Sequence, residues 1–252
     1  MRLRLLLPLA VLSTAAVADE LEARRPTVDL GVGFRGFTRT FGNTDGTSTT
    51  LGYSGASSGV AAEASYFPGA FATKSLWGDL GLFAEGQLSL GLTTTFSSNH
   101  FATSATTVRG GLAVRVPSGR HMLLVHAGVE SRAFSVAATS VEGVNRPALP
   151  NVGFLGPRAG LGYRVALTSP ITLQVKAAFG WALQQGELGS AGYFPSSSTF
   201  GLDAQVAVSF AITAGVEVRV IGDWSRAFIT LDASHTAADQ SFGGGVMLAV
   251  GL

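Results

Sequence analysis

Apolar and polar residues alternate along much of the chain, and the alternation is longest over residues 171–183. The sequence there is ITLQVKAAFGWAL, in which every odd-numbered residue is apolar and every even-numbered residue is polar or small. A period of two is typical of a strand with one apolar and one polar face. The run is longer than an ordinary strand of roughly 5 to 6 residues and suits a tilted strand of about 9 to 11 residues that crosses a bilayer.

The same alternation recurs along the chain, and we predict ten strands from it. All seventeen acidic and basic residues within these segments lie on the face opposite the apolar one. A charged side chain that faces lipid near the midplane costs roughly 2 to 4 kcal/mol, which gives the segregation a physical reason. The predicted strands are 27–41, 58–67, 78–92, 107–116, 121–135, 154–167, 171–183, 199–210, 213–224 and 241–252.

The connections between the predicted strands alternate in length. Those that follow residues 41, 92, 135, 183 and 224 are long and rich in Gly, Ser, Thr and Asn, whereas three of the other four have two to four residues. This alternation indicates an all-β, up-and-down antiparallel transmembrane barrel with short periplasmic turns and long extracellular loops. We predict about ten strands, with eight or twelve as alternatives, because strand boundaries carry errors of about 2 to 4 residues.

Composition agrees with a membrane barrel and disfavours other classes. Only 13% of the 252 residues are charged, against about 25% in soluble domains, and the mean hydropathy is +0.35. Beyond the N-terminus no apolar run reaches the roughly 18 residues of a membrane helix. The net charge of +1 gives no argument for nucleic acid, and the absence of Cys excludes disulfides and thiolate metal sites.

The N-terminus reads as an export signal. Two arginines within the first four residues precede an apolar stretch, and Ala16-Val17-Ala18 forms a small-x-small cleavage motif before Asp19. This pattern is typical of a secretory signal peptide cleaved after Ala18. We therefore predict a signal peptide over residues 1–18, a periplasmic lead-in over 19–26 and one barrel domain over 27–252.

These features together resemble the bacterial outer-membrane β-barrels as a class. The resemblance covers nearly the whole mature chain and includes the final strand, Phe242 to Leu252. In that class the last strand commonly ends in an aromatic residue and acts as the assembly signal, whereas this chain ends in Leu252. The resemblance implies a location in the Gram-negative outer membrane, with membrane lipid and the barrel assembly machinery as partners.

The charged faces of the strands should point into the barrel. Eight-stranded barrels are just filled by side chains, and ten strands lie near that filled end of the range. The charges would then form a paired network that plugs the lumen, or alternatively line a narrow porin-like path for ions or small solutes. The predicted network comprises Asp29, Arg35, Arg39, Glu63, Asp79, Glu85, Arg109, Arg115, Glu130, Arg132, Arg158, Arg164, Lys176, Asp203, Glu217, Arg219 and Asp223.

Aromatic residues fall near the predicted strand ends, as in the girdles of membrane barrels. An outer girdle would contain Trp181, Phe200, Trp224 and Phe242, and an inner girdle Tyr66, Tyr163 and Phe210.

Candidates for catalysis are few. The omptin-type outer-membrane proteases are also ten-stranded and use paired acids with an Asp–His pair at the outer rim. This chain lacks Asp-x-Asp and Asp-x-His, which leaves Asp223, Asp232 and His235 as weak rim candidates, and enzymatic activity stays undecided. Four scattered His residues show no ligand spacing, so we expect neither a metal nor a cofactor. We expect a structural or surface-interaction role, in which the loops contact an extracellular ligand; the alternatives are a narrow pore and an omptin-like rim hydrolase.

Overall fold

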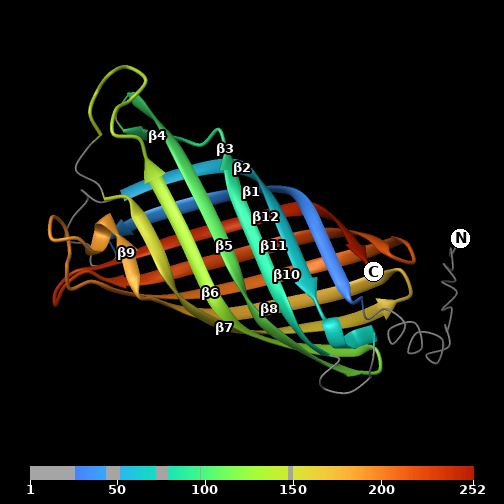
Figure 1. Cartoon of the computed structure of the whole chain (residues 1–252). Helices are drawn as coiled ribbons and strands as arrows, with labels where there is room; N and C mark the ends of the chain where they lie inside the picture. The colour runs from blue at the N-terminus through green and yellow to red at the C-terminus, as the bar shows by residue number, and fades with distance from the viewer. Residues whose placement is uncertain (1–25, 44–51, 72–78, 97, 147–149) are drawn as a thin grey trace, which may run out of the picture.

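Ten long strands form a closed antiparallel barrel (Figure 1). The computed structural model describes residues 26–43, 52–71, 79–96, 98–146 and 150–252, so the predicted signal peptide and all of the lead-in except Pro26 lie outside the described residues. The barrel strands are β1 (Val28–Asn43), β2 (Gly52–Tyr66), β3 (Leu80–Leu90), β5 (Asn99–Ser118), β6 (His121–Val136), β7 (Val152–Thr168), β8 (Ile171–Ala182), β10 (Ser198–Thr213), β11 (Val216–Thr230) and β12 (Thr236–Gly251).

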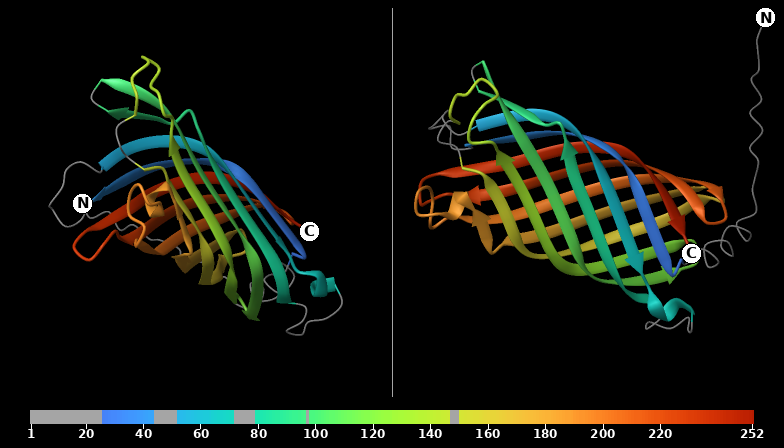
Figure 2. Two further views of the ribbon diagram at one scale, coloured as in Figure 1. Left: turned by 60° about the vertical axis from the view of Figure 1, so that its left-hand side comes forward. Right: turned by 45° about the horizontal axis from the view of Figure 1, so that its top comes forward.

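The first and last strands close the barrel. β1 pairs with β2 on one side and with β12 on the other, with Leu30 opposite Val250 and Phe34 opposite Val246. Each barrel strand therefore has a hydrogen-bonded neighbour on both sides, which removes the exposed edges of an open sheet. The two ends of the described chain meet where the Thr27 N–H donates to the Leu252 carbonyl at 2.6 Å. We call this end of the barrel, visible in both views of Figure 2, the inner end.

The ten-stranded antiparallel prediction is confirmed, but several strands are longer at the outer end than predicted. β5 begins at Asn99 rather than at residue 107, β11 continues to Thr230 and β12 begins at Thr236. The predicted connection over 225–240 is therefore largely paired strand, with Phe228 opposite Ala238. Alternation failed to identify these extensions because beyond the bilayer no lipid requires an apolar outer face, while backbone pairing with the neighbouring strand continues.

One inner turn also lies elsewhere than predicted. We expected residues 211–212 to connect two strands, but β10 continues to Thr213 and the turn is formed by Ala214 and Gly215. The pairing register between β10 and β11 shifts between Ala211 and Thr213. Beyond this shift Thr213 still pairs with Val216, so β10 extends past the predicted turn. The other short inner turns consist of Gly119 with Arg120 and of Ser169 with Pro170, and Gly119 has a φ of 56° that favours glycine.

Short elements extend the outer end and one inner connection. β4 (Thr93–Phe96) folds back on β5 after Gly91, whose φ of 61° makes the bend, and β9 (Gln184–Gly186) pairs with β7. The described ranges also contain the 3-10 turns η1 (Pro68–Phe71) and η3 (Glu187–Gly189). No helix in the described ranges is long and apolar enough to span a membrane.

The two faces of the wall differ in chemistry. Val32 and Phe34 point outward with exposed fractions of 62% and 72%, whereas Arg115 and Arg219 point inward and are buried. Outward apolar side chains suit lipid, and the inner face carries the charges.

The predicted girdle residues also occupy the outer surface of the wall. Phe200 pairs with Trp181 and stacks on Phe228 at a centroid distance of 4.7 Å, so Phe228 extends the predicted outer girdle. Trp224 lies opposite Phe242. Tyr66, Tyr163 and Phe210 lie close to the inner ends of β2, β7 and β10.

Candidate functional site

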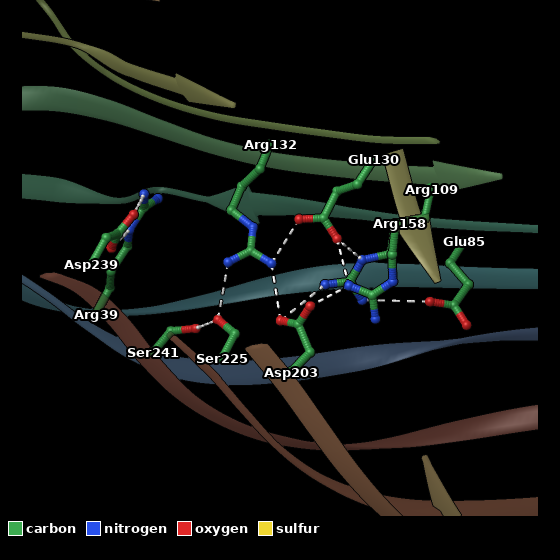
Figure 3. A network of polar contacts seen from close by, with 10 residues as sticks. All are labelled: Arg39, Glu85, Arg109, Glu130, Arg132, Arg158, Asp203, Ser225, Asp239 and Ser241. Carbon is green, nitrogen blue, oxygen red and sulfur yellow. Dashed lines mark hydrogen bonds and ion pairs between the residues drawn. The ribbon is translucent and has the colours of Figure 1, made fainter. Parts of the chain in front are cut away.

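The middle of the barrel holds a cluster of ion pairs that joins four strands. Glu130 on β6 contacts Arg109 at 2.7 Å, Arg132 at 2.9 Å and Arg158 at 2.7 Å. Asp203 on β10 contacts the same three guanidinium groups from the opposite side, with 3.0 Å to Arg132 (Figure 3). Each of the two carboxylates thus contacts three arginines, and each arginine contacts both carboxylates. These contacts offset part of the free energy that is lost when the charged groups are removed from water.

Glu85 on β3 links this cluster to the inner half of the barrel. Its carboxylate contacts Arg109 at 3.5 Å and the Lys176 ammonium at 3.2 Å. A second group, nearer the inner end, centres on Arg219, which contacts Asp29 at 2.8 Å and Glu217 at 2.6 Å and also pairs with Glu63. The ion pairs therefore follow the barrel axis rather than forming one ring.

The remaining charges of the predicted network form pairs along the wall. The three pairs are Arg35 with Asp223, Arg39 with Asp239, and Arg115 with Asp79. Arg164 also contacts Glu217 at 3.1 Å.

Asp239 was missed from the sequence because it falls within the predicted 225–240 connection. Its inward position could have been predicted from alternation along the strand. Asp239 is an even number of residues from Met247 and Ala249, which are buried, so all three lie on the same face of β12. The seventeen predicted residues are nine cations and eight acids, so Asp239 makes the two numbers equal.

Between the ion pairs and the outer end of the barrel lies a cluster of buried apolar side chains. The outer apolar cluster consists of Phe41, Val152, Phe154, Leu188, Ala227, Ile229, Leu231 and Ala237. A second group of Leu92, Phe101, Phe134 and Val136 lies nearby, and Arg39 stacks over the Phe134 ring at 4.4 Å. On each strand, the cluster members and the inward charges are separated by an even number of residues, as Phe41 and Arg39 are on β1. They therefore lie on the same, inward face. The alternation of the sequence thus indicated the inward direction of these apolar residues, which carry no charge to mark it.

The connection between β8 and β10 contributes the central residue of that cluster. Leu188 of η3 is 0% exposed, although it belongs to a surface connection. Its neighbour Glu187 accepts hydrogen bonds from the Asn151 backbone N–H at 2.8 Å and from the Asn151 side-chain amide at 3.1 Å, and contacts Arg146 at 3.3 Å. The backbone N–H of Asn151, followed by the Arg146 charge, lowers the pKa of Glu187 below its usual range.

The Glu187 contacts predict an acid-sensitive outer connection. A carboxylate with a lowered pKa contributes fully above its ordinary pKa of about 4.3, and the contribution is lost as the pH falls through the lowered value. We expect the hydrogen-exchange protection of the Asn151 amide, corrected for intrinsic rates, to decrease below about pH 4. In Glu187→Gln the protection should be lower at neutral pH and flat over the same range; an unchanged acid response in that variant would contradict the assignment.

The structure does not bring the three rim candidates together. Asp232 and His235 form a pair at 2.8 Å in the connection between β11 and β12, where hydrogen bonds from the Ser234 backbone N–H and from His235 lower the pKa of Asp232 to about 2. Asp223 was expected at a strand end, but β11 continues for seven further residues, roughly 23 Å along the strand. Asp223 pairs instead with Arg35 inside the barrel. No group of three or more His, Asp or Glu side chains suited to a metal occurs in the described part of the chain.

Closure of the sheet, outward apolar residues and an inward charged face define a bacterial outer-membrane β-barrel. No protein-family model matches the chain, and no curated protein matches it. The chain is similar in fold to the outer membrane protease OmpT from Escherichia coli, with a TM-score of 0.50 and 12% identity over 91% of this chain and 98% of that chain. At this identity the likeness concerns the fold alone.

Two other solved barrels are similar over most of their length. The translocator domain of the autotransporter NalP from Neisseria meningitidis has a TM-score of 0.42 and 14% identity over 92% of each chain. The Pseudomonas putida toluene transporter, TodX, has a TM-score of 0.36 and 8% identity over 94% of this chain and 92% of that chain. The solved barrels with this likeness thus include a protease, a translocator and a transporter.

Proposed function

We propose that this protein is a sealed outer-membrane barrel that serves a structural or surface-interaction role through its outer connections. The observation that carries the proposal is the shared pairing of Arg109, Arg132 and Arg158 with Glu130 and Asp203 across the barrel interior. A continuous water path at this level would have to separate charges that now satisfy one another. The seventeen predicted charges together with Asp239 are nine cations and nine acids, and this balance leaves little net field from them to attract an ion.

Two further features support closure. The outer apolar cluster lies between the ion pairs and the exterior, and an apolar constriction resists wetting. The connection that carries Leu188 is held by Glu187 to a neighbouring connection, so the closure involves surface segments as well as the barrel wall. The outer connections would then be available for contact with an extracellular ligand.

The proposal includes the route to the membrane. The signal peptide is cleaved after Ala18, the chain crosses to the periplasm, and the barrel assembly machinery inserts it into the outer membrane. N-terminal sequencing of the protein extracted from outer membranes should begin at Asp19. A sequence that begins at Met1 would contradict cleavage.

Single-channel recording of the refolded full chain in a planar bilayer tests the sealed lumen. We expect no steady conductance from protein whose folding is verified by faster migration of unboiled than of boiled samples on gels. A reproducible conductance would instead support the second candidate, a narrow pore, which is favoured by cavities of about 90 and 140 Å³ at the inner end. In a pore, charge reversal at Arg109 or Glu217 should change the ion selectivity.

A further inference from the structure

One arginine departs from the inward arrangement of the charges. Among the Asp, Glu, Lys and Arg residues of the described strands, Arg226 alone lies on the outward face of the wall. It alternates with Ser225 and Ala227, which point inward and are buried, and it shares its face with Trp224 and Phe228. Ionisable side chains that face a membrane are rare and usually have a partner. The partner of Arg226 is therefore to be sought outside the barrel wall.

The Arg226 guanidinium group packs on an aromatic ring and is not otherwise bonded. Its Cζ atom lies 4.9 Å from the centre of the Phe228 ring, which stacks in turn on Phe200. In the described part of the chain Arg226 donates no hydrogen bond and forms no ion pair, and its Nε atom is covered by neighbouring atoms. Stacking on the ring orients the guanidinium plane but uses none of its N–H groups. The terminal N–H groups thus remain as donors for a ligand on the outer wall.

Two further polar side chains extend this donor group across neighbouring strands. Arg226 lies opposite Gln240 on β12, and Gln240 lies opposite Thr40 on β1. All three are on the outward face, and none donates a side-chain hydrogen bond to another described residue. Neighbouring strands are about 4.8 Å apart, so the three positions span roughly 10 Å. The row offers a guanidinium, an amide and a hydroxyl to the same region of the membrane surface.

The row lies at the level of the lipid headgroups. Arg226 is ten positions beyond Val216, where β11 begins next to the inner turn. Ten residues of strand extend about 33 Å, which a tilt of roughly 35 to 45° reduces to about 25 Å across the membrane. This equals the height of the apolar band of an outer-membrane barrel. From the row toward the inner end the wall is apolar, with Phe242 55% and Val246 52% exposed.

We propose that Arg226, with Gln240 and Thr40, binds the phosphate group of a lipid in the outer leaflet. The phosphate accepts hydrogen bonds from the terminal guanidinium N–H groups and from the amide, and its charge neutralises the arginine. The acyl chains pack against the apolar wall at Phe242 and Val246. A lipid phosphate fits better than a protein carboxylate, because lipid covers the wall here and its headgroups bring phosphate to this level. The inference is independent of whether the lumen conducts, because the site lies on the outside of the wall.

Quenching of tryptophan fluorescence by brominated lipid tests this site directly. Trp224 lies two residues from Arg226 on the same face. The chain has three tryptophans, so the background Trp77→Phe with Trp181→Phe leaves Trp224 as the single reporter. This full-length protein is refolded into phosphatidylcholine vesicles in which either phosphatidic acid or part of the phosphatidylcholine carries brominated acyl chains. We expect phosphatidic acid to bind beside Trp224 about fivefold more tightly than phosphatidylcholine, because a cation at the membrane surface attracts an anionic lipid by about that factor.

Two arginines serve as a matched pair of variants in this background. Arg226→Gln should remove the preference, so that both lipids bind equally. Arg120→Gln should retain it, because Arg120 is exposed in an inner turn at the other end of the barrel. Neither change leaves a cavity, and faster migration of unboiled than of boiled samples on gels verifies folding. The proposal is overturned if phosphatidic acid shows no preference in the parent protein, if Arg226→Gln keeps the preference, or if the two glutamine variants behave alike.

Inorganic phosphate distinguishes a lipid from a soluble anion as the source of the phosphate group. The preference for phosphatidic acid should persist when phosphate replaces chloride in the buffer at constant ionic strength, because the acyl chains hold the lipid headgroup beside Arg226. Loss of the preference in phosphate buffer would show that the site takes the free anion, and would overturn the assignment to a lipid.

Discussion

Replacing Asp203 by Asn should destabilise the barrel more than any other single neutralisation of an inward acid. Asp203 contacts Arg109, Arg132 and Arg158, and its side chain is 12% exposed. The variant leaves Glu130 as the one carboxylate that contacts Arg132 and Arg158 in the described structure, whereas Arg109 keeps Glu85 as well. Breaking a buried ion pair typically costs roughly 3 to 5 kcal/mol because a charge stays buried without compensation. The free energy of unfolding of the refolded protein, followed by tryptophan fluorescence in urea, measures the effect.

Two controls separate charge pairing from general damage. Glu142→Gln neutralises an exposed carboxylate in the connection between β6 and β7, which accepts a hydrogen bond from the His100 backbone N–H at 3.1 Å. Because the glutamine side-chain oxygen can accept the same hydrogen bond, this change should alter the unfolding free energy by less than about 0.5 kcal/mol. The double variant Asp203→Asn with Arg132→Gln restores the balance of charges and should recover part of the lost stability. If the single and double variants lose equal amounts of unfolding free energy, the loss is due to the shape of the side chain at position 203 and not to its charge.

Replacing Leu188 by Ala should release the outer connection while the barrel stays folded. Leu188 is fully buried in the outer apolar cluster, and Leu→Ala changes in cores cost roughly 2 to 5 kcal/mol. The local hydrogen bonds, including that from the Phe194 N–H to the Leu188 carbonyl at 3.0 Å, should then open more often. We expect hydrogen-exchange protection of the Phe194 amide to fall by at least about 30-fold, because 2 kcal/mol corresponds to that factor.

Leu183 provides the matched control for this experiment. It lies in the same outer part of the chain but is 75% exposed, so Leu183→Ala removes the same atoms without leaving a cavity. Protection at Phe194 should be unchanged in that variant, and the barrel strands should remain protected in both. Loss of strand protection in Leu188→Ala would show that the outer apolar cluster supports the whole barrel and not only the connection. Equal effects of the two changes would contradict the role of Leu188 burial.

The inward apolar residues of the outer end can be found in the sequence, but only if the end of the bilayer is also known. Phe41 and Phe154 share the parity of Arg39 and Arg158, so their inward direction follows from alternation alone. Alternation gives the inward direction of an apolar residue. It does not tell whether that residue lies beside the ion pairs or beyond the bilayer in the outer apolar cluster, because the end of the bilayer is not marked in the sequence. The same reason explains why the outer parts of β5, β11 and β12 were predicted as connections.

The sequence alone predicted the class of fold, a barrel of about ten strands, and a common polar face for seventeen of the charged residues. Lipid imposes that pattern, because it excludes charge from one face of every strand, residue by residue. Only the tertiary structure decided which charges meet. Arg219 and Asp29 are 190 positions apart, and closure of β1 onto β12 brings their strands to opposite sides of a single neighbour. Pairing across a lumen depends on strand stagger and side-chain reach, and neither leaves a periodic trace in the sequence.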